Sequence, residues 1–95
     1  MKPWVCVSIQ SKTTEQTLHD LIRVNDADLI EIRLDYREED LDLVRLAEVA
    51  KAPLIGTNRR KDQGGKATEP EVERVQLLMD AVKAGFRYID LASTT

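Results

Sequence analysis

The sequence predicts an α/β protein in which strands and helices alternate in the order βαβαβαβ. Short apolar segments rich in β-branched residues alternate with segments whose apolar residues recur every three or four positions. The apolar segments start about 25 to 35 residues apart, the length of one βα unit. Strands joined through helices run parallel, with right-handed crossovers. A closed (β/α)8 TIM barrel needs about 250 residues, so the 95 residues fit the first half of such a barrel, and we expect residues 1–95 to form a single domain.

The first βα unit is predicted near the N-terminus. Residues 4–9, WVCVSI, are rich in β-branched residues and carry an aromatic, which favours a strand. Thr13 lies three residues before Gln16, a capping-box spacing that begins a helix. Helical spacing then follows at Leu18, Leu21 and Ile22. The intervening loop, residues 10–13, lacks the glycines of a dinucleotide-binding turn, which argues against a Rossmann fold.

The second unit shows the clearest alternation. Residues 28–35, DLIEIRLD, alternate strictly from Ile30 onward and predict a second strand. One face of the next helix is marked by Leu43, Leu46, Ala47 and Ala50. Residues 53–59 predict a third strand, with proline at its first position, where a missing N–H does least harm.

The third helix is predicted from its cap, its apolar stripe and its end. Thr68 and Glu71 have capping-box spacing, and Pro70 is tolerated in a first helical turn. The inner stripe is predicted to consist of Val72, Val75, Met79 and Val82. Gly85 is expected to end the helix in a left-handed conformation. Residues 88–91 then begin a fourth strand.

The composition excludes several classes of partner and site. The net charge of −3 and the 4% of aromatic residues argue against nucleic-acid binding. No apolar stretch approaches the roughly 20 residues that cross a bilayer, so no membrane partner is expected. Cys6 is the only cysteine, which excludes an intrachain disulfide or a cysteine-based metal site and fits a cytoplasmic protein. We expect Cys6 to be buried packing.

Three charged residues are predicted to share one face of the second strand. Residues two apart in a strand point the same way, so Glu31, Arg33 and Asp35 oppose the apolar set of Ile30, Ile32 and Leu34. In a barrel the charged face is the interior, where charges are costly unless they are paired or used. The alternative is a solvated sheet face, or an ion network without catalytic purpose.

The third strand adds Arg59, which shares a face with Thr57 and lies at the carboxyl end, where parallel α/β folds gather their sites. The planar fork of an arginine suits carboxylates and hydroxyls. Arg60 and Lys61, which follow it, are expected to be solvated loop charges. Residues 64–65, two glycines, predict either the hinge of a lid or only a turn.

The remaining chemically capable residues are not expected to form a catalytic centre. His19, the only histidine, falls in the first helix, too far from the strand ends to act as a base there. Ser8 lies near the carboxyl end of the first strand and has no paired histidine, so hydrogen bonding suits it better than nucleophilic attack. The spacing shows no cluster of metal ligands.

Four stretches together resemble the N-terminal part of the type I 3-dehydroquinate dehydratase family, enzymes of the shikimate pathway. They are VCVSI at 5–9, ADLIEIRLDY at 27–36, IGTNRRKDQGG at 55–65 and YIDLAST at 88–94. They resemble the family's first strand ending near a serine, its E-x-R-x-D second strand, its T-x-R third strand with a Gly-Gly loop, and its fourth strand. The match keeps this order over nearly the whole chain.

The resemblance implies a (β/α)8 barrel and a lyase that converts 3-dehydroquinate to 3-dehydroshikimate in aromatic amino acid biosynthesis, without metal or cofactor. In the family a lysine forms a Schiff base with the substrate ketone, which makes the α proton easier to remove, and a histidine moves protons. By position, the resemblance assigns substrate binding to Ser8, Glu31, Arg33 and Arg59. It implies that Glu31 and Arg59 bind the ring hydroxyls of the substrate and that Arg33 orients Glu31. Asp35 would contact these residues without touching the substrate itself.

The same resemblance places the catalytic lysine and histidine on later strands. We therefore expect no catalytic residue in this chain, 3-dehydroquinate as its small-molecule partner, and a homodimer or an association with the missing half. The alternative is a catalytically incomplete half-barrel that acts as a binding or assembly module. Two departures remove carboxylates: Gln63 stands where the family often has an acid before Gly-Gly, and Ala92 where its fourth strand often reads D-x-E.

Overall fold

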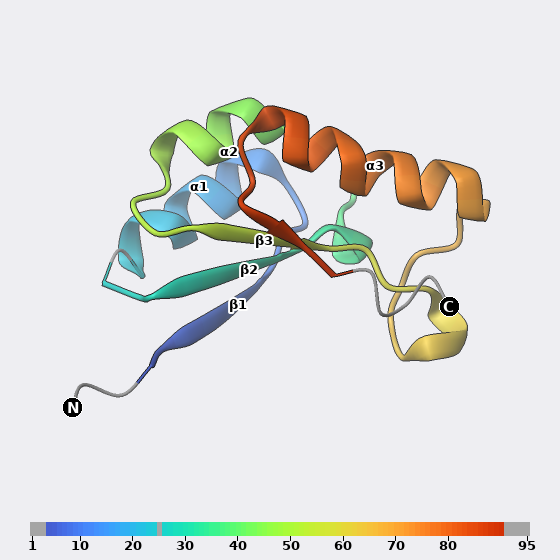
Figure 1. Ribbon diagram of the computed structural model, residues 1–95, viewed down its shortest axis with the longest axis horizontal. Helices are drawn as coiled ribbons and strands as arrows, with labels where there is room; N and C mark the ends of the chain where they lie inside the picture. The colour runs from blue at the N-terminus through green and yellow to red at the C-terminus, as the bar shows by residue number, and fades with distance from the viewer. Residues whose placement is uncertain (1–3, 25, 91–95) are drawn as a thin grey trace.

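The computed structural model describes residues 4–24 and 26–90 and shows alternating strands and helices (Figure 1). In chain order the elements are β1 Cys6–Gln10, α1 Thr14–Arg23, β2 Leu29–Arg33, the 3-10 turn η1 Leu34–Tyr36, α2 Leu43–Val49, β3 Leu54–Thr57, the 3-10 turn η2 Lys61–Gln63, α3 Glu71–Ala84 and β4 Tyr88–Ile89. The predicted βαβαβαβ order is confirmed.

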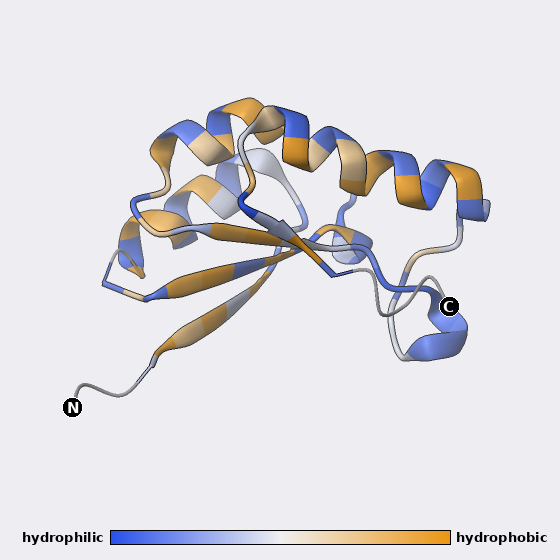
Figure 2. Cartoon of the chain, in the orientation of Figure 1, coloured by the Kyte–Doolittle hydropathy of each residue, from blue (hydrophilic) through white to orange (hydrophobic). Residues whose placement is uncertain are grey.

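The strands form one parallel sheet in the order β1-β2-β3-β4. All three α-helices cover the same face of this sheet, and the opposite face carries no helix of the described chain (Figure 1). Apolar and polar residues alternate along each helix (Figure 2). The buried core between the layers includes Ile9, Leu21, Ile30, Ile32, Leu46, Leu54, Leu78 and Phe86. This half-covered parallel sheet is consistent with the first half of a (β/α)8 barrel.

The strands are shorter or shifted relative to the predicted ranges. The first covers Cys6–Gln10 instead of residues 4–9, and the third ends at Thr57 instead of residue 59. The second ends at Arg33, because the chain turns there into η1 and buries the Asp35 side chain against Arg33. Strict alternation did not reveal this, since Leu34 is fully buried in the turn as it would be in a strand.

The helix caps divide into confirmed and wrong predictions. Thr13 caps α1, because its hydroxyl accepts a hydrogen bond from the Gln16 N–H at 3.1 Å. The capping box of Thr68 and Glu71 is wrong: Pro70 occupies the N-cap of α3 without a side-chain hydrogen bond, and the Glu71 carboxylate instead binds Arg74. Gly85 ends α3 in the left-handed conformation, as predicted.

The predicted inner stripe of α3 is also wrong. Three of its four members are exposed, by 81%, 44% and 44%: Val72, Met79 and Val82. The buried residues of α3 are Arg74, Leu78 and Ala81. Both sets have helical spacing, but they are offset by one position, about 100° around a helix with 3.6 residues per turn. Spacing alone does not choose between such faces; here a buried guanidinium takes a core position.

No helix in the described part of the chain is both long and apolar enough to span a bilayer.

Candidate functional site

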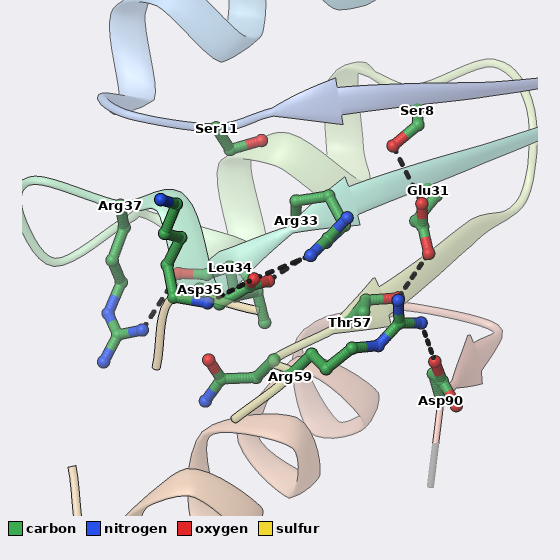
Figure 3. Close-up of polar contacts among 12 residues, drawn as sticks. Ser8, Ser11, Glu31, Arg33, Leu34, Asp35, Arg37, Thr57, Arg59 and Asp90 are labelled. Atoms are coloured by element: carbon green, nitrogen blue, oxygen red, sulfur yellow. Dashed lines mark hydrogen bonds and ion pairs between the residues drawn. The ribbon is translucent and has the colours of Figure 1, made fainter. Parts of the chain in front are cut away.

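The sheet face without helices changes from apolar to polar along the strands. Near the amino ends of the strands, a hollow of about 390 Å³ is lined mainly by apolar residues: Trp4, Leu29, Pro53, Ile55, Tyr88 and Ile89, with Asp28. Toward the carboxyl ends the same face carries Ser8, Glu31, Arg33, Thr57 and Arg59 (Figure 3). In parallel α/β folds the carboxyl ends of the strands hold the ligand, so the polar end is the candidate site.

Glu31 is held by hydroxyl groups from both neighbouring strands (Figure 3). The Ser8 Oγ donates to Oε1 at 2.8 Å, and the Thr57 Oγ1 donates to Oε2 at 2.7 Å. The register explains the first contact, since Ser8 lies directly opposite Glu31 across the β1–β2 ladder. A carboxylate oxygen can accept about two hydrogen bonds. Each oxygen therefore keeps accepting capacity for a ligand on the open face.

Arg33 forms a two-point ion pair with Asp35. Its Nε and Nη2 donate to the Asp35 carboxylate at 3.1 and 2.8 Å, and its guanidinium lies 5.0 Å from the centre of the Tyr36 ring. The hydrogen bonds that Arg33 donates to Asp35, with the charges of Asp35 and Glu31, raise the pKa of Arg33. Arg33 was expected to orient Glu31; in this structure the Arg33 guanidinium is held by Asp35, and Ser8 and Thr57 donate the hydrogen bonds to Glu31.

Asp35 lies in η1 rather than on the strand face where it was predicted. Its side chain is fully buried, and its Oδ2 accepts from both Arg33 and the backbone N–H of Lys66, the latter at 3.1 Å. This carboxylate therefore joins the β2 end of the site to the loop that follows β3.

Arg59 follows the end of β3 and pairs with Asp90, an acid that follows the end of β4. Its Nη2 donates to the Asp90 Oδ2 at 2.9 Å, and its side chain is 35% exposed (Figure 3). The sequence held the signal for this pair: Asp90 follows β4, which neighbours β3, so the two charges fall at the same carboxyl edge. The guanidinium is thus oriented by Asp90 and still reaches the open face.

The loop after β3 is closed by backbone hydrogen bonds. The Ala67 N–H donates to the Arg59 carbonyl at 3.0 Å, and the Gly65 N–H donates to the Arg60 carbonyl at 2.9 Å. Gly64 adopts a φ of 84°, and a Cβ on Gly65 would clash with the Arg59 carbonyl. Both glycines are therefore required by the geometry of this compact turn.

The two cations after Arg59 differ from each other. Lys61 is exposed, as expected. Arg60 is not simply solvated: its guanidinium lies 3.2 Å from Asp62 and 3.9 Å from Glu71. Gln63, one of the two departures from the family pattern, is exposed in η2, and Ala92, the other, lies outside the described residues.

The other candidate groups lie away from the site. His19 is exposed on α1, which confirms its predicted surface position. The prediction for Cys6 is wrong: it is exposed, because it shares its face of β1 with the exposed Ser8, two residues along the strand. Every lysine in the described part of the chain is exposed. Residues 4–24 and 26–90 contain no group of three or more His, Cys, Asp or Glu that could hold a metal ion.

A buried polar network behind Arg59 was missed by sequence reasoning. Asn58 and Arg74 are both fully buried. Asn58 donates a hydrogen bond to the Glu69 carboxylate, and Arg74 donates to the Glu71 carboxylate. Burial tends to raise the pKa of Glu69, but hydrogen bonds from Asn58 and Arg37 outweigh it and lower the pKa to about 2. The available signal was Asn58 itself, a polar residue at a helix-facing position between Thr57 and Arg59, because a buried amide requires partners.

The arrangement can bind a small molecule that carries both hydroxyl and anionic groups. Glu31 offers hydrogen-bond acceptors, while Arg33 and Arg59 offer planar donors oriented by their own carboxylate partners. Pre-oriented side chains lose less entropy when a ligand binds.

Several known proteins are similar in sequence to this chain over most of its length. The chain is 38% identical, over 92% of its length, to a 3-dehydroquinate dehydratase of Desulfotalea psychrophila, of which the match covers 38%. It is 35% identical, over 98% of its length, to a 3-dehydroquinate dehydratase of Methanothermobacter thermautotrophicus, of which the match covers 44%. A pentafunctional AROM polypeptide of Candida glabrata matches 96% of the chain at 34% identity, with 6% of its own length. The chain thus spans less than half the length of these relatives.

The family model of type I 3-dehydroquinase matches residues 5–95. That match includes β1 to β4 and every residue of the polar face described above. The chain therefore belongs to the type I 3-dehydroquinase family.

Proposed function

We propose that this chain is the N-terminal, substrate-binding half of a 3-dehydroquinate dehydratase, a lyase that converts 3-dehydroquinate to 3-dehydroshikimate through a Schiff base. The observation that carries the proposal is the carboxylate of Glu31, held at 2.8 and 2.7 Å by Ser8 and Thr57 at the carboxyl edge of the sheet, with two oriented guanidinium groups on the same face. The substrate has hydroxyl, ketone and carboxylate groups that suit these donors and acceptors.

In this proposal each site residue has a defined task. Glu31 and Arg59 bind the ring hydroxyls, Ser8 fixes the Glu31 carboxylate, and Arg33 adds positive charge beside it. Asp35 and Asp90 orient the two arginines. Tight orientation of this kind lowers the entropy cost of placing the substrate for reaction.

The described residues do not supply the reacting groups themselves. His19 lies on the outer helix layer, and none of the described lysines is enclosed in the apolar setting that activates Schiff-base lysines. The lysine and histidine of the reaction would therefore come from the rest of the barrel. The same observation favours a second candidate, a half-barrel that binds the substrate or assembles with another half but does not turn over.

We further propose that residues 1–95 act as one structural unit that operates in the cytoplasm and associates with another half-barrel or a second copy. The open sheet edges and the apolar hollow near Trp4 support association. Sedimentation should show a mass that rises with protein concentration. A monomer at the highest soluble concentration would contradict this part of the proposal.

Binding and chemistry can be separated by one experiment on the 95-residue chain. Incubation with 3-dehydroquinate should raise its melting temperature in a saturable manner. Addition of borohydride should leave the intact mass unchanged, because no competent lysine lies in the described residues. A covalent adduct would overturn the assignment of the reacting lysine to the rest of the barrel. Absence of any stabilisation by the substrate would contradict the binding role itself.

A further inference from the structure

The buried guanidinium of Arg74 occupies an unusual place for a charge. Arg74 is 0% exposed and faces the sheet from α3, where Leu78 and Ala81 are its neighbours on the buried stripe. Arginine is almost never fully buried unless it is paired. Its Nε and Nη2 donate to the two oxygens of Glu71 at 2.9 and 2.7 Å, which supplies that pair.

The remaining nitrogen of the fork reaches the main chain at the end of β3. The Nη1 of Arg74 donates to the backbone carbonyl of Asn58 at 2.7 Å. That carbonyl belongs to the peptide bond between Asn58 and Arg59. The hydrogen bond therefore fixes the orientation of this peptide plane, and with it the direction in which the Arg59 side chain leaves the backbone. A charged donor to a carbonyl is stronger than a neutral one.

The Asn58 side chain adds a second connection in the same place. Its Nδ2 donates to the Glu69 carboxylate at 3.0 Å and to the Arg74 carbonyl at 3.2 Å. Glu69 also accepts from Arg37 at 2.9 Å. The two ends of the loop between Asn58 and Glu69 are therefore held together beneath the open face.

These contacts are hard to explain by stability alone. The Arg74 side chain is 0% exposed, but its partner Glu71 is 44% exposed, so only the arginine side of the pair is buried. Replacing buried charges with well-packed apolar residues is often neutral or stabilising, and the next residues on the buried stripe, Leu78 and Ala81, are apolar. A Met or Leu at position 74 would lack the donor to the Asn58 carbonyl. The orientation of Arg59, the next residue in the chain, would then no longer be fixed by this hydrogen bond.

We propose that Arg74 is a positioning residue that acts through the Asn58 carbonyl to aim the Arg59 guanidinium at Asp90 and at the bound substrate. The proposal rests on the proposed function only for its substrate; the link from Arg74 to Arg59 stands on the hydrogen bonds alone. Arg74 lies on the covered side of the sheet and does not touch the substrate.

The test compares Arg74→Met, Arg74→Lys and a control, Arg45→Met, which removes an exposed helix arginine 3.3 Å from Glu15. The first readout is the NMR cross-peak of the Arg59 side-chain Nε–Hε group, assigned by its loss in Arg59→Lys. Arg74→Met should shift this cross-peak, because the Arg59 guanidinium, whose Nη2 donates to Asp90, would no longer be held in place. Arg74→Lys should restore part of the wild-type signal, because an amine can still donate to the carbonyl, and Arg45→Met should change nothing.

The second readout is the affinity for 3-dehydroquinate in a two-mutation cycle. Arg74→Met should weaken binding about tenfold, and should cause no further loss in a chain that already carries Arg59→Gln. Losses that multiply in the double variant would overturn the proposal, because they would mean that Arg74 does not act through Arg59. An unchanged Arg59 cross-peak in Arg74→Met would overturn it as well.

Two controls keep the outcomes separable. If circular dichroism shows that Arg74→Met does not fold, Arg74→Lys and Glu71→Gln take its place. Glu71→Gln weakens the hydrogen bonds that hold the Arg74 guanidinium. Each of these two variants should shift the cross-peak. If the wild-type chain binds no 3-dehydroquinate, the proposed function fails while the NMR comparison still decides the role of Arg74.

Discussion

Glu69 provides a quantitative test of the network behind the site. Its carboxylate accepts hydrogen bonds from Asn58 at 3.0 Å and Arg37 at 2.9 Å, and these lower its pKa from 4.5 to about 2. The perturbation is Glu69→Gln, which keeps the size and one acceptor oxygen but removes the charge. We expect this variant to be less stable near neutral pH and less sensitive to acid.

The magnitude follows from linkage between protonation and folding. A group whose pKa is depressed by folding stabilises the protein above its unfolded pKa and loses that contribution as the pH falls. At 1.36 kcal/mol per pKa unit, the change from 4.5 to about 2 corresponds to about 3 kcal/mol. The Glu69 side chain is 16% exposed, and its Arg37 partner 23%, so screening by solvent reduces this to about 1–2 kcal/mol.

The assay is urea unfolding followed by circular dichroism between pH 7 and pH 2. The wild-type chain should lose the contribution of Glu69 as the pH falls from about 4.5 toward 2, and Glu69→Gln should lack that component of the slope. Glu73→Gln is the matched control, because Glu73 is an exposed acid in the first turn of α3, just after Glu69. An acid slope in Glu69→Gln equal to that of the wild type would refute the argument.

Three further predictions concern the site, the loop and the core. Thr57→Val removes the hydroxyl that donates to Glu31 at 2.7 Å and should weaken 3-dehydroquinate binding about tenfold in calorimetry, with the fold retained. Gly65→Ala places a Cβ against a backbone carbonyl and should destabilise the chain by about 1–3 kcal/mol in urea unfolding; an unchanged midpoint would mean that the loop is not built as described. Leu78→Ala should cost about 2–5 kcal/mol and Met79→Ala less than about 1 kcal/mol, and the reverse order would restore the helix face predicted from spacing.

The second strand shows how much of the fold its sequence could reveal. Ile30 and Ile32 alternate with Glu31 and Arg33, and the structure buries the first pair and places the second on the open face. Such a pattern is decisive because a shift of one residue would bury every charge. The third helix has no such pattern. Its sequence contains two stripes with helical spacing, and only packing against the sheet determines which of them is buried.

The site was predictable in its members but not in its connections. Spacing and position at the strand ends singled out Glu31, Arg33 and Arg59, which the structure brings to one face. Their partners depend on strand register and on the turns after the strands. Thr57 donates to Glu31 from the neighbouring strand, and Asp90, just after β4, accepts from Arg59. Local sequence patterns do not reveal these long-range contacts. They also do not predict that Arg74, a charged residue on a helix, is buried.

Chemical-shift mapping during a titration with 3-dehydroquinate is the sharpest test of the proposal that the carboxyl ends of these strands bind this compound. The wild-type chain should show saturable shifts confined to the neighbourhood of Ser8, Glu31, Thr57 and Arg59, and Glu31→Gln should weaken them while the exposed control Glu73→Gln leaves them intact. No shift up to millimolar substrate, or shifts centred on the apolar hollow near Trp4, would show that the carboxyl ends of the strands do not bind 3-dehydroquinate.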